Sequence, residues 1–218
     1  DNPQLSLCSF DPLCNYLNTG GFGDIQNNAA GCNSVSEILT SCNTCTTSIL
    51  KTWTGAIGTD WDDAGNWSPA GVPDNCDTVY IATGLPDYPV VNSTITIGGL
   101  IIESGASLDL GNYSLLNNGT ITIFDGTITS TSSSNSIIFR NAAAVSIENA
   151  TLSATNISIE GYSGQFYFIE NIINSNIAIS DSSSRNGPNT IYGNVFNGNL
   201  TITTNSADTN AETFISPS

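Results

Sequence analysis

A short alternating segment recurs through the second half of the chain and constrains its fold more than any other feature. Each copy places apolar residues at every other position, which is the period of a half-buried strand. Gly, Asn, Asp and Ser lie between the copies and supply turns. The copies are residues 94–97, 107–110, 120–123, 136–139, 144–147, 156–159, 165–168, 176–179 and 199–202.

The first apolar residues of these segments form two interleaved series. One series steps by 20, 20 and 23 residues through Ile137, Ile157, Ile177 and Leu200. The other steps by 24 and 21 residues through Ile121, Val145 and Phe166. Such a period indicates coils of at least two strands, stacked so that they bury a shared apolar column that no single coil could bury alone.

We therefore predict a mainly β protein, a parallel, right-handed β-helix preceded by a small disulfide-rich unit with short helices. The alternative is a meander sandwich, because strands at this spacing also suit antiparallel hairpins. The expected divisions are a cysteine-rich unit at 1–50, a Trp-rich capping or entry segment at 51–92 and β-helix coils at 93–218. Because the chain begins at Asp1 and ends just beyond a strand, we expect it to be a piece of a longer exported polypeptide.

The charge balance excludes several classes of partner. The 218 residues carry 3 basic and 19 acidic side chains, no His and a net charge of −16. Without a basic patch to neutralise phosphates, such a surface repels nucleic acid and anionic membranes. No apolar run is long enough to span a bilayer, so direct membrane insertion is not expected. The absence of His also excludes Ser–His and Cys–His nucleophiles.

The cysteines predict an oxidising compartment. Five of the six lie before residue 46, in a segment with two expected short helices at 12–17 and 35–41, the second preceded by a Ser34…Glu37 capping box. Their even number predicts disulfides, and the pairing among Cys8, Cys14, Cys32 and Cys42 stays open. We expect Cys45 to join Cys76. Zinc is a weaker reading, because Cys42 and Cys45 lack a second matching pair.

The chain also carries a pattern that spans the Trp-rich segment and the first coil. It consists of Trp53-Thr-Gly55, Asn66-Trp67-Ser-Pro69, Asp77-Thr-Val-Tyr-Ile81, Tyr88-Pro-Val-Val91 and Gly105-Ala-Ser-Leu108. This pattern resembles a segment common in large secreted proteins of the Bacteroidetes phylum. The spacing of the first four cysteines is similar to that of an N-terminal unit in those proteins. Residues 193–202 are similar to their β-solenoid coils. The resemblance implies export by type IX secretion and display as adhesins or gliding-motility proteins.

The three Trp residues have two interpretations. Trp53, Trp61 and Trp67 fall within a short turn-rich stretch just before the coils. An open solenoid end exposes apolar side chains and unpaired strand groups, and three indoles could cover it. The functional alternative is a carbohydrate platform, because Trp stacks on sugar faces.

Three further groups of residues are candidate sites. Asp60, Asp62 and Asp63 form an acidic cluster whose hard oxygen ligands suit Ca²⁺, although the spacing is not that of an EF-hand and a solvated loop is the simpler reading. Glu148 and Glu170, on neighbouring coils, raise the possibility of a β-helix polysaccharide hydrolase or lyase. Repeated Thr-Ile-Thr triplets raise that of ice binding, but they are irregularly spaced and Thr simply favours strands.

One modification is expected from the resemblance. Asp77-Thr78-Val79 fits the Asp–Ser/Thr–apolar pattern of O-glycosylation reported for that phylum, which makes Thr78 a candidate acceptor. Taken together, the sequence predicts a non-catalytic stalk or adhesin segment of a large exported cell-surface protein, with no cofactor. Its expected partners are the secretion and surface-attachment machinery, other parts of the same chain and glycans. A carbohydrate-binding module and, less strongly, a polysaccharide-degrading enzyme are the alternatives.

Overall fold

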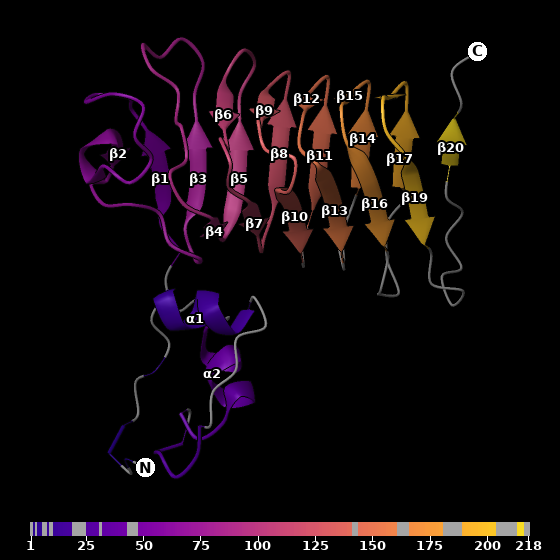
Figure 1. The fold of residues 1–218 in the computed structure, drawn as a ribbon. Coiled ribbons are helices and arrows are strands. Elements are labelled where there is room, and N and C mark those ends of the chain that lie inside the picture. The colour runs from indigo at the N-terminus through magenta and orange to yellow at the C-terminus, as the bar shows by residue number, and fades with distance from the viewer. Residues whose placement is uncertain are drawn as a thin grey trace.

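The chain forms a parallel β-helix with a small helical unit at its N-terminal end (Figure 1). The computed structural model describes residues 2, 4–5, 8, 11–18, 25–30, 32–42, 48–140, 144–160, 166–180, 189–203 and 213–215. Within these residues, strands stack along one axis in three sheets, so the antiparallel meander sandwich is excluded.

Each sheet is a column of strands that occupy the same position in successive coils. The nine-stranded sheet contains, in spatial order, β2 (Trp67–Ser68), β1 (Leu50–Trp53), β3 (Thr78–Ile81), β5 (Gly99–Ile102), β8 (Ile121–Phe124), β11 (Val145–Glu148), β14 (Phe166–Ile169), β17 (Asn189–Tyr192) and β20 (Thr213–Ile215). The five-stranded sheet contains β6 (Ser107–Asp109), β9 (Thr127–Thr129), β12 (Thr151–Leu152), β15 (Ile172–Ile173) and β18 (Val195–Phe196). The six-stranded sheet contains β4 (Ile95–Ile97), β7 (Leu115–Asn117), β10 (Ser136–Arg140), β13 (Asn156–Glu160), β16 (Asn176–Ser180) and β19 (Leu200–Thr203).

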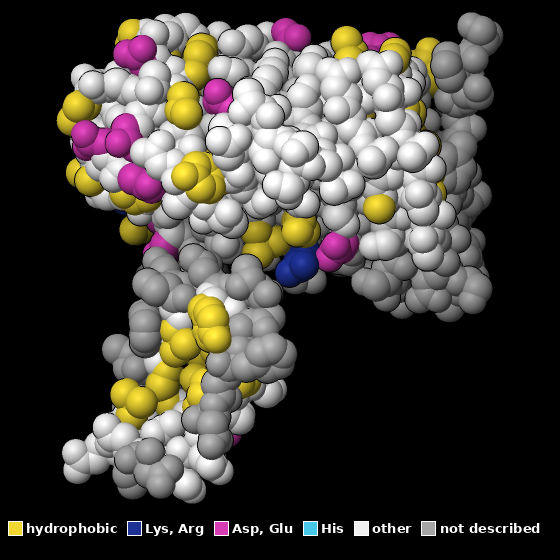
Figure 2. All heavy atoms as spheres, viewed as in Figure 1, with side chains coloured by type: hydrophobic (Ala, Val, Ile, Leu, Met, Phe, Trp, Pro, Cys, Tyr) yellow, Lys and Arg dark blue, Asp and Glu magenta, His cyan; other side chains and the backbone are white. Residues whose placement is uncertain are grey.

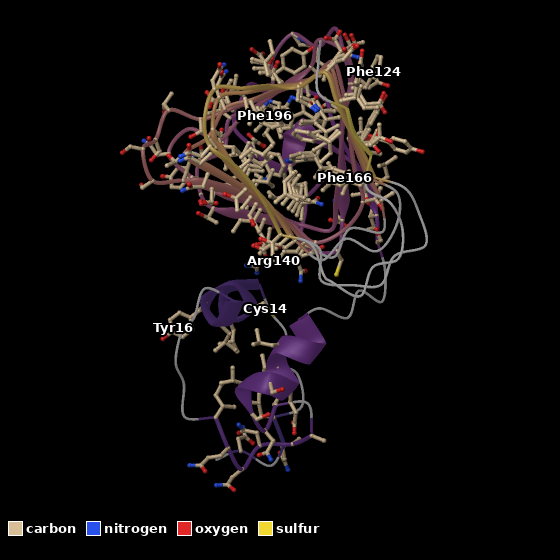
Figure 3. All side chains as sticks on the ribbon, turned by 90° about the vertical axis from the view of Figure 1, so that its right-hand side faces the viewer. Cys14, Tyr16, Phe124, Arg140, Phe166 and Phe196 are labelled. Carbon is tan, nitrogen blue, oxygen red and sulfur yellow. A yellow bond between two sulfur atoms is a disulfide. The ribbon has the colours of Figure 1, made fainter. Side chains whose placement is uncertain are left out.

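The chain visits the three sheets in a fixed order, so each full coil is a triangle of three strands. From β5 to β19 the order nine-, five-, six-stranded sheet repeats five times. The sequence predicted at least two strands per coil, and the third strand is the short one of the five-stranded sheet. Figure 3, which looks along the coil axis, shows this triangular outline. The right-handed sense of the coil stays a prediction.

The register confirms the two apolar series read from the sequence. In the six-stranded sheet Ile157 pairs with Ile137 and Ile177, and Ile177 pairs with Leu200. In the nine-stranded sheet Val145 pairs with Ile121 and Phe166. Side chains at equivalent positions of successive coils therefore stand directly above one another, about 4.8 Å apart.

The apolar column is buried almost completely. Every inward-facing position from Val79 to Ile179 within the described strands is at most 6% exposed where it carries an apolar side chain. Phe139, Phe166 and Phe168 are its largest aromatic members, and each is fully buried. The column and the three Trp residues form a single hydrophobic cluster. The sequence predicted that the coils begin at residue 93. The parallel sheet begins earlier, with the pairing of β1 and β3.

A ladder of buried asparagine amides closes one corner of the triangle. Asn171, which is fully buried, accepts a hydrogen bond from Ala150 N at 2.8 Å and donates one to Ile147 O at 2.7 Å. Its Nδ2 also donates to Asn194 Oδ1 at 2.9 Å, and Asn194 Nδ2 donates to Phe168 O at 2.6 Å. Each amide thus satisfies backbone groups of the preceding coil at the point where the chain turns out of the sheet.

Close backbone approach at another corner requires glycine. A Cβ added to Gly119 would lie 1.8 Å from Gly98 O, one coil away. Because that contact is with backbone, no side-chain movement would relieve it. Gly119 therefore allows the turn between β7 and β8 to stack directly on the turn between β4 and β5.

The N-terminal unit has its own small core. It contains α1 (Asp11–Asn18) and α2 (Val35–Cys42), as the sequence predicted. Ser34 Oγ accepts a hydrogen bond from Glu37 N at 3.1 Å, and Glu37 Oε2 accepts one from Asn33 N at 3.0 Å, which confirms a capping arrangement at α2. The cluster of buried residues comprises Cys8, Cys14, Leu17, Cys32 and Ile38.

Disulfides stabilise this unit, because its few apolar residues cannot do so alone. Cys8 and Cys32 are joined, with Cα atoms 5.7 Å apart. Cys14 and Cys76 each take part in a disulfide as well, and no described cysteine is free. The expected Cys45–Cys76 pair involves a residue outside the described part of the chain, as does the side chain of Cys42. Among the described residues, none of the helices is of a length and hydropathy that would carry the chain through a bilayer.

Replacing the buried amide tests the corner ladder. Asn171→Ala removes hydrogen bonds from Ala150 N and Ile147 O, which lie in the interior and have no access to water. Each unsatisfied buried group costs about 1–3 kcal/mol, so we expect the free energy of unfolding in urea to fall by at least about 2 kcal/mol.

Asn174→Ala is the matched control, since this neighbouring amide makes side-chain bonds to Ser153 and Asn197 on the exposed surface. We expect its effect to stay within about 0.5 kcal/mol. Equal effects of the two variants would show that the buried ladder does not stabilise the corner.

Candidate functional site

The three Trp residues pack against one another at the N-terminal end of the β-helix. Trp53 is on β1 and Trp67 is on β2, the antiparallel strand at the outer edge of the nine-stranded sheet. The Trp67 ring lies 5.0 Å from Trp53 and 4.7 Å from Trp61 between centroids, edge to face in both cases. Their exposed fractions are 0, 1 and 3% for Trp53, Trp61 and Trp67.

Hydrogen bonds hold the indoles in place. Trp53 Nε1 donates to Asp87 O and Trp67 Nε1 donates to Trp61 O, each at 2.8 Å. Asn66, fully buried, accepts from Ile57 N at 2.8 Å and donates to Asp60 O at 2.9 Å, so one amide ties together the loop around the rings. With both indole N–H groups satisfied internally, these two side chains have no free polar group for a ligand.

This geometry supports the capping interpretation of the Trp segment. The indoles share one cluster with the apolar column and cover its first coil. Their burial argues against stacking of a sugar on their faces, because a sugar ring needs an accessible aromatic surface. Edge protection is completed by β2, a two-residue antiparallel strand followed by Pro69, which cannot donate to a further strand.

A buried lysine fastens the loop that follows β2. Lys51 is 7% exposed, and its Nζ donates to Pro69 O at 3.2 Å and to Ala70 O at 3.3 Å. Nζ also lies 3.2 Å from the position that a Cβ on Gly71 would take. The ammonium therefore stabilises the loop after β2 through internal hydrogen bonds and is buried away from any anionic ligand.

The acidic cluster binds its own backbone. Asp60 Oδ1 accepts from Asp62 N at 2.9 Å and also from Asn92 Nδ2, and Asp63 Oδ1 accepts from Gly65 N at 2.9 Å. Asp63 thereby caps a short 3-10 helix, η1 (Ala64–Asn66). No group of three or more potential ligands converges among the described residues, so this arrangement does not favour the Ca²⁺ reading of Asp60, Asp62 and Asp63.

A pocket lies beside this cluster. It has a volume of about 200 Å³ and is lined by residues 61–62, 72–75 and 93–96 and by Cys14 of the helical unit. Partial burial, together with the charge of Asp60, raises the pKa of Asp62, which lines the pocket. Figure 2 shows acidic side chains gathered over this end of the β-helix.

Glu148, Glu160 and Glu170, each of which is close to the end of a strand, lie at separate places. Glu148, on β11, pairs with Phe124 and Ile169, and its Oε1 accepts from Ser146 Oγ at 2.7 Å. Glu170 follows in the turn after β14, with φ 55°, so it does not stand on the same row as Glu148. Glu160, on the six-stranded sheet, forms an ion pair with Arg140 at 3.0 Å. The strand register therefore does not place Glu148 and Glu170 directly above one another, as the hydrolase or lyase hypothesis required.

The Thr-rich triplets are divided among the sheets. Thr96 is on β4 and Thr201 on β19, both in the six-stranded sheet, whereas Thr122 belongs to the nine-stranded one. Two strands carry both Thr residues of a triplet: β9, with Thr127 and Thr129 in the five-stranded sheet, and β19, with Thr201 and Thr203 in the six-stranded sheet. No flat ladder of Thr pairs forms in the described coils, and this argues against ice binding.

Asp77 and Thr78, the two polar residues of the expected glycosylation motif, lie in different environments. Asp77 is buried, and its carboxylate accepts from Ile49 N and from Asp74 N at 3.1 Å each. Thr78 faces outward on β3 beside Gly99, where a Cβ would lie 2.9 Å from Thr78 Oγ1. Glycosylation of Thr78 stays a prediction, with Asp77 already engaged in the fold.

Sequence analysis missed one surface that the register assembles. Phe124, Glu148, Ile169 and Tyr192 are neighbours on the outer face of the nine-stranded sheet. They are 21 to 24 residues apart in the sequence, each at the end of a strand. The signal was present in the same coil period that predicts the interior column, applied to the outward-facing positions.

Comparison with known proteins places the β-helix within a family but does not provide an activity. A family model described as a domain of unknown function (DUF8693) matches residues 52–215. The matched range begins within β1 and ends with β20, so it covers the β-helix and leaves out the helical unit. No curated protein and no solved structure matches the chain.

Truncation of the central indole tests the cap. Trp67→Ala removes both edge-to-face contacts and opens the end of the apolar column. Large aromatic-to-Ala changes in a core cost about 3–5 kcal/mol, and we expect a loss of that size in guanidinium unfolding followed by near-UV circular dichroism.

Ile57→Ala in the same loop serves as the control, because Ile57 is 65% exposed and should change the unfolding free energy by no more than about 0.5 kcal/mol. A loss below about 1 kcal/mol for Trp67→Ala would contradict the capping role.

Proposed function

The chain belongs to this DUF8693 family of domains of unknown function, and we propose that it is a non-catalytic, rigid segment of a large exported surface protein. In this role the β-helix is a stalk or spacer that holds other parts of the same polypeptide away from the cell. Surface attachment and secretion machinery are its proposed partners, and the outside of the bacterial outer membrane is its proposed location.

One observation carries the proposal: an unbroken parallel ladder runs through the nine-stranded sheet from β1 to β20. Each of the five coils from β5 to β19 adds the same three-strand layer over the same apolar column. A stack of identical layers transmits force and length along its axis, and each layer contacts only its neighbours. Stiffness and adjustable length are the properties that a spacer needs.

Composition and covalent structure support an extracellular setting. A net charge of −16 keeps the surface repulsive toward other acidic surfaces and favours solubility in medium. The absence of free thiols among the described cysteines fits an oxidising compartment. The resemblance of the Trp-rich segment to secreted Bacteroidetes proteins points to type IX secretion as the export route.

Deleting whole coils tests the spacer role. Because Ile121, Val145 and Phe166 share one row, removal of residues 121–165 joins two equivalent coil positions and lets β14 pair with β5. We expect this variant to fold cooperatively and to be shorter by two layers, about 10 Å, in small-angle X-ray scattering.

Removal of residues 121–155 is the matched control, because it leaves β13 without the rest of its coil. We expect this variant to lose cooperative unfolding. Folding of the control, or collapse of the in-phase deletion, would show that the coils are not interchangeable layers.

The location is tested in the parent protein in its native cells. Epitope-tagged full-length protein should be removed from intact cells by added protease, and the in-phase deletion should be displayed at the same level. Protection of the tag in intact cells would overturn the surface assignment, irrespective of the folding results.

A further inference from the structure

The outer face of the nine-stranded sheet carries aromatic and acidic side chains in one straight row. Phe124, Glu148, Ile169 and Tyr192 pair in succession across β8, β11, β14 and β17. Phe124 is 51% exposed and Tyr192 is 40% exposed, whereas inward-facing neighbours such as Phe168 are fully buried. In Figure 3 Phe124 lies on the outside of the triangular coil, and Phe166 and Phe196 lie inside it.

A second row runs beside the first and extends the same character. It pairs Thr122, Ser146, Tyr167 and Thr190 across the same four strands. Ser146 Oγ donates to Glu148 Oε1 at 2.7 Å, which orients the carboxylate and leaves Oε2 available as an acceptor. The face therefore combines rings, hydroxyls and a positioned negative charge over about 14 Å, the span of four strands.

Cations are missing from this face among the described residues. Lys51 is buried against the loop after β2, and Arg140 is on the six-stranded sheet, paired with Glu160. The remaining basic residue, Arg185, lies outside the described residues. In the turns next to the row, Asp125 and Glu170 add negative charge. The charge of this face is thus complementary to a cationic ligand.

The strands under the row have no free edge. β8, β11, β14 and β17 each pair with a strand on both sides, so an extended peptide cannot add to the sheet there. A ligand on this face is held by side chains alone. Spaced aromatic rings on a flat sheet suit a stiff polymer of saturated rings, whose C–H faces pack against them, and ammonium groups gain both from Glu148 and from the aromatic faces.

We propose that the row Phe124–Glu148–Ile169–Tyr192 binds an amine-bearing polysaccharide that lies along the axis of the β-helix. This site is separate from the Trp cap and does not depend on the spacer role. The row gives the stalk an adhesive side, with ring stacking at its two ends and a carboxylate between them.

The test measures binding of oligosaccharides to the intact chain by isothermal titration calorimetry, at a pH at which glucosamine amines are protonated. The probes are a glucosamine oligosaccharide, its fully N-acetylated form of equal length, and polylysine. We expect the glucosamine oligomer to bind, the N-acetylated form to bind at least about tenfold more weakly, and affinity to fall as salt is added.

Variants locate the site. Phe124→Ala, Tyr192→Ala and Glu148→Gln should each weaken glucosamine binding by about fivefold or more. Tyr113→Ala is the aromatic control, since Tyr113 is also 40% exposed but lies in the turn between β6 and β7. Glu160→Gln is the charge control on the six-stranded sheet. Both controls should bind like the unchanged chain, and Phe124→Leu replaces Phe124→Ala if the latter does not fold.

Each other outcome overturns the proposal. No binding of the glucosamine oligomer removes the site, and equal binding of the N-acetylated form removes the role of the amine. Tighter binding of polylysine that depends on the same row would indicate a basic protein partner. Equal losses in the row variants and in the two controls would mean that the bulk negative charge, and not this face, attracts the ligand.

Discussion

The whole β-helix depends on the parallel, residue-for-residue stacking of one coil on the next. In such a ladder the side chain at a given position meets its counterpart about 4.8 Å above and below, so most interior positions stay apolar through the stack. Asn117, buried between Ile97 and Phe139, is a polar exception. The row Ile137, Ile157 and Ile177 meets this condition with identical residues, and Val145 and Phe166 show how far it can be relaxed. Differences in coil length are accommodated at the corners. Gly119 allows close backbone approach at one corner, and the Asn171 amide forms hydrogen bonds with backbone groups at another.

That constraint explains what was predictable from the sequence. The two interior series could be recognised because an apolar residue recurs in each at steps of 20 to 24 residues. All nine expected strands are present within one or two residues of their predicted bounds. The third sheet was harder to detect because β12, β15 and β18 are two residues long, too short to show alternation. β5 lacked the pattern for another reason, since Gly99-Leu-Ile-Ile102 has no polar residue at its outward positions.

Polar interior positions escaped prediction for a different physical reason. Asn171 and Asn194 look like ordinary turn residues in a chain rich in Asn, and only the coil geometry shows that their amides face backbone groups of the coil before. The Trp segment was a better case, because three large rings beside an open solenoid end have few other places to be buried. Carboxylate pairing failed at Glu148 and Glu170, since Glu170 lies one residue past the register partner of Glu148 and a one-residue offset in a parallel strand moves a side chain to a different row.

The interior constraint also indicates where this fold has freedom to acquire a function. Inward-facing positions are restricted by their neighbours above and below, and turn positions are restricted by close approach or by amide ladders. Outward-facing strand positions carry no such restriction, so a residue that is apolar there is not required by the core. Phe124 and Tyr192 are exposed aromatic side chains that share a row with Glu148 and Ile169 and lie beside a row of Thr, Ser and Tyr hydroxyls. The coil stacking that the core requires therefore also aligns surface residues that are distant in sequence. In this way a spacer made of repeated layers can carry a binding face without any change in its interior.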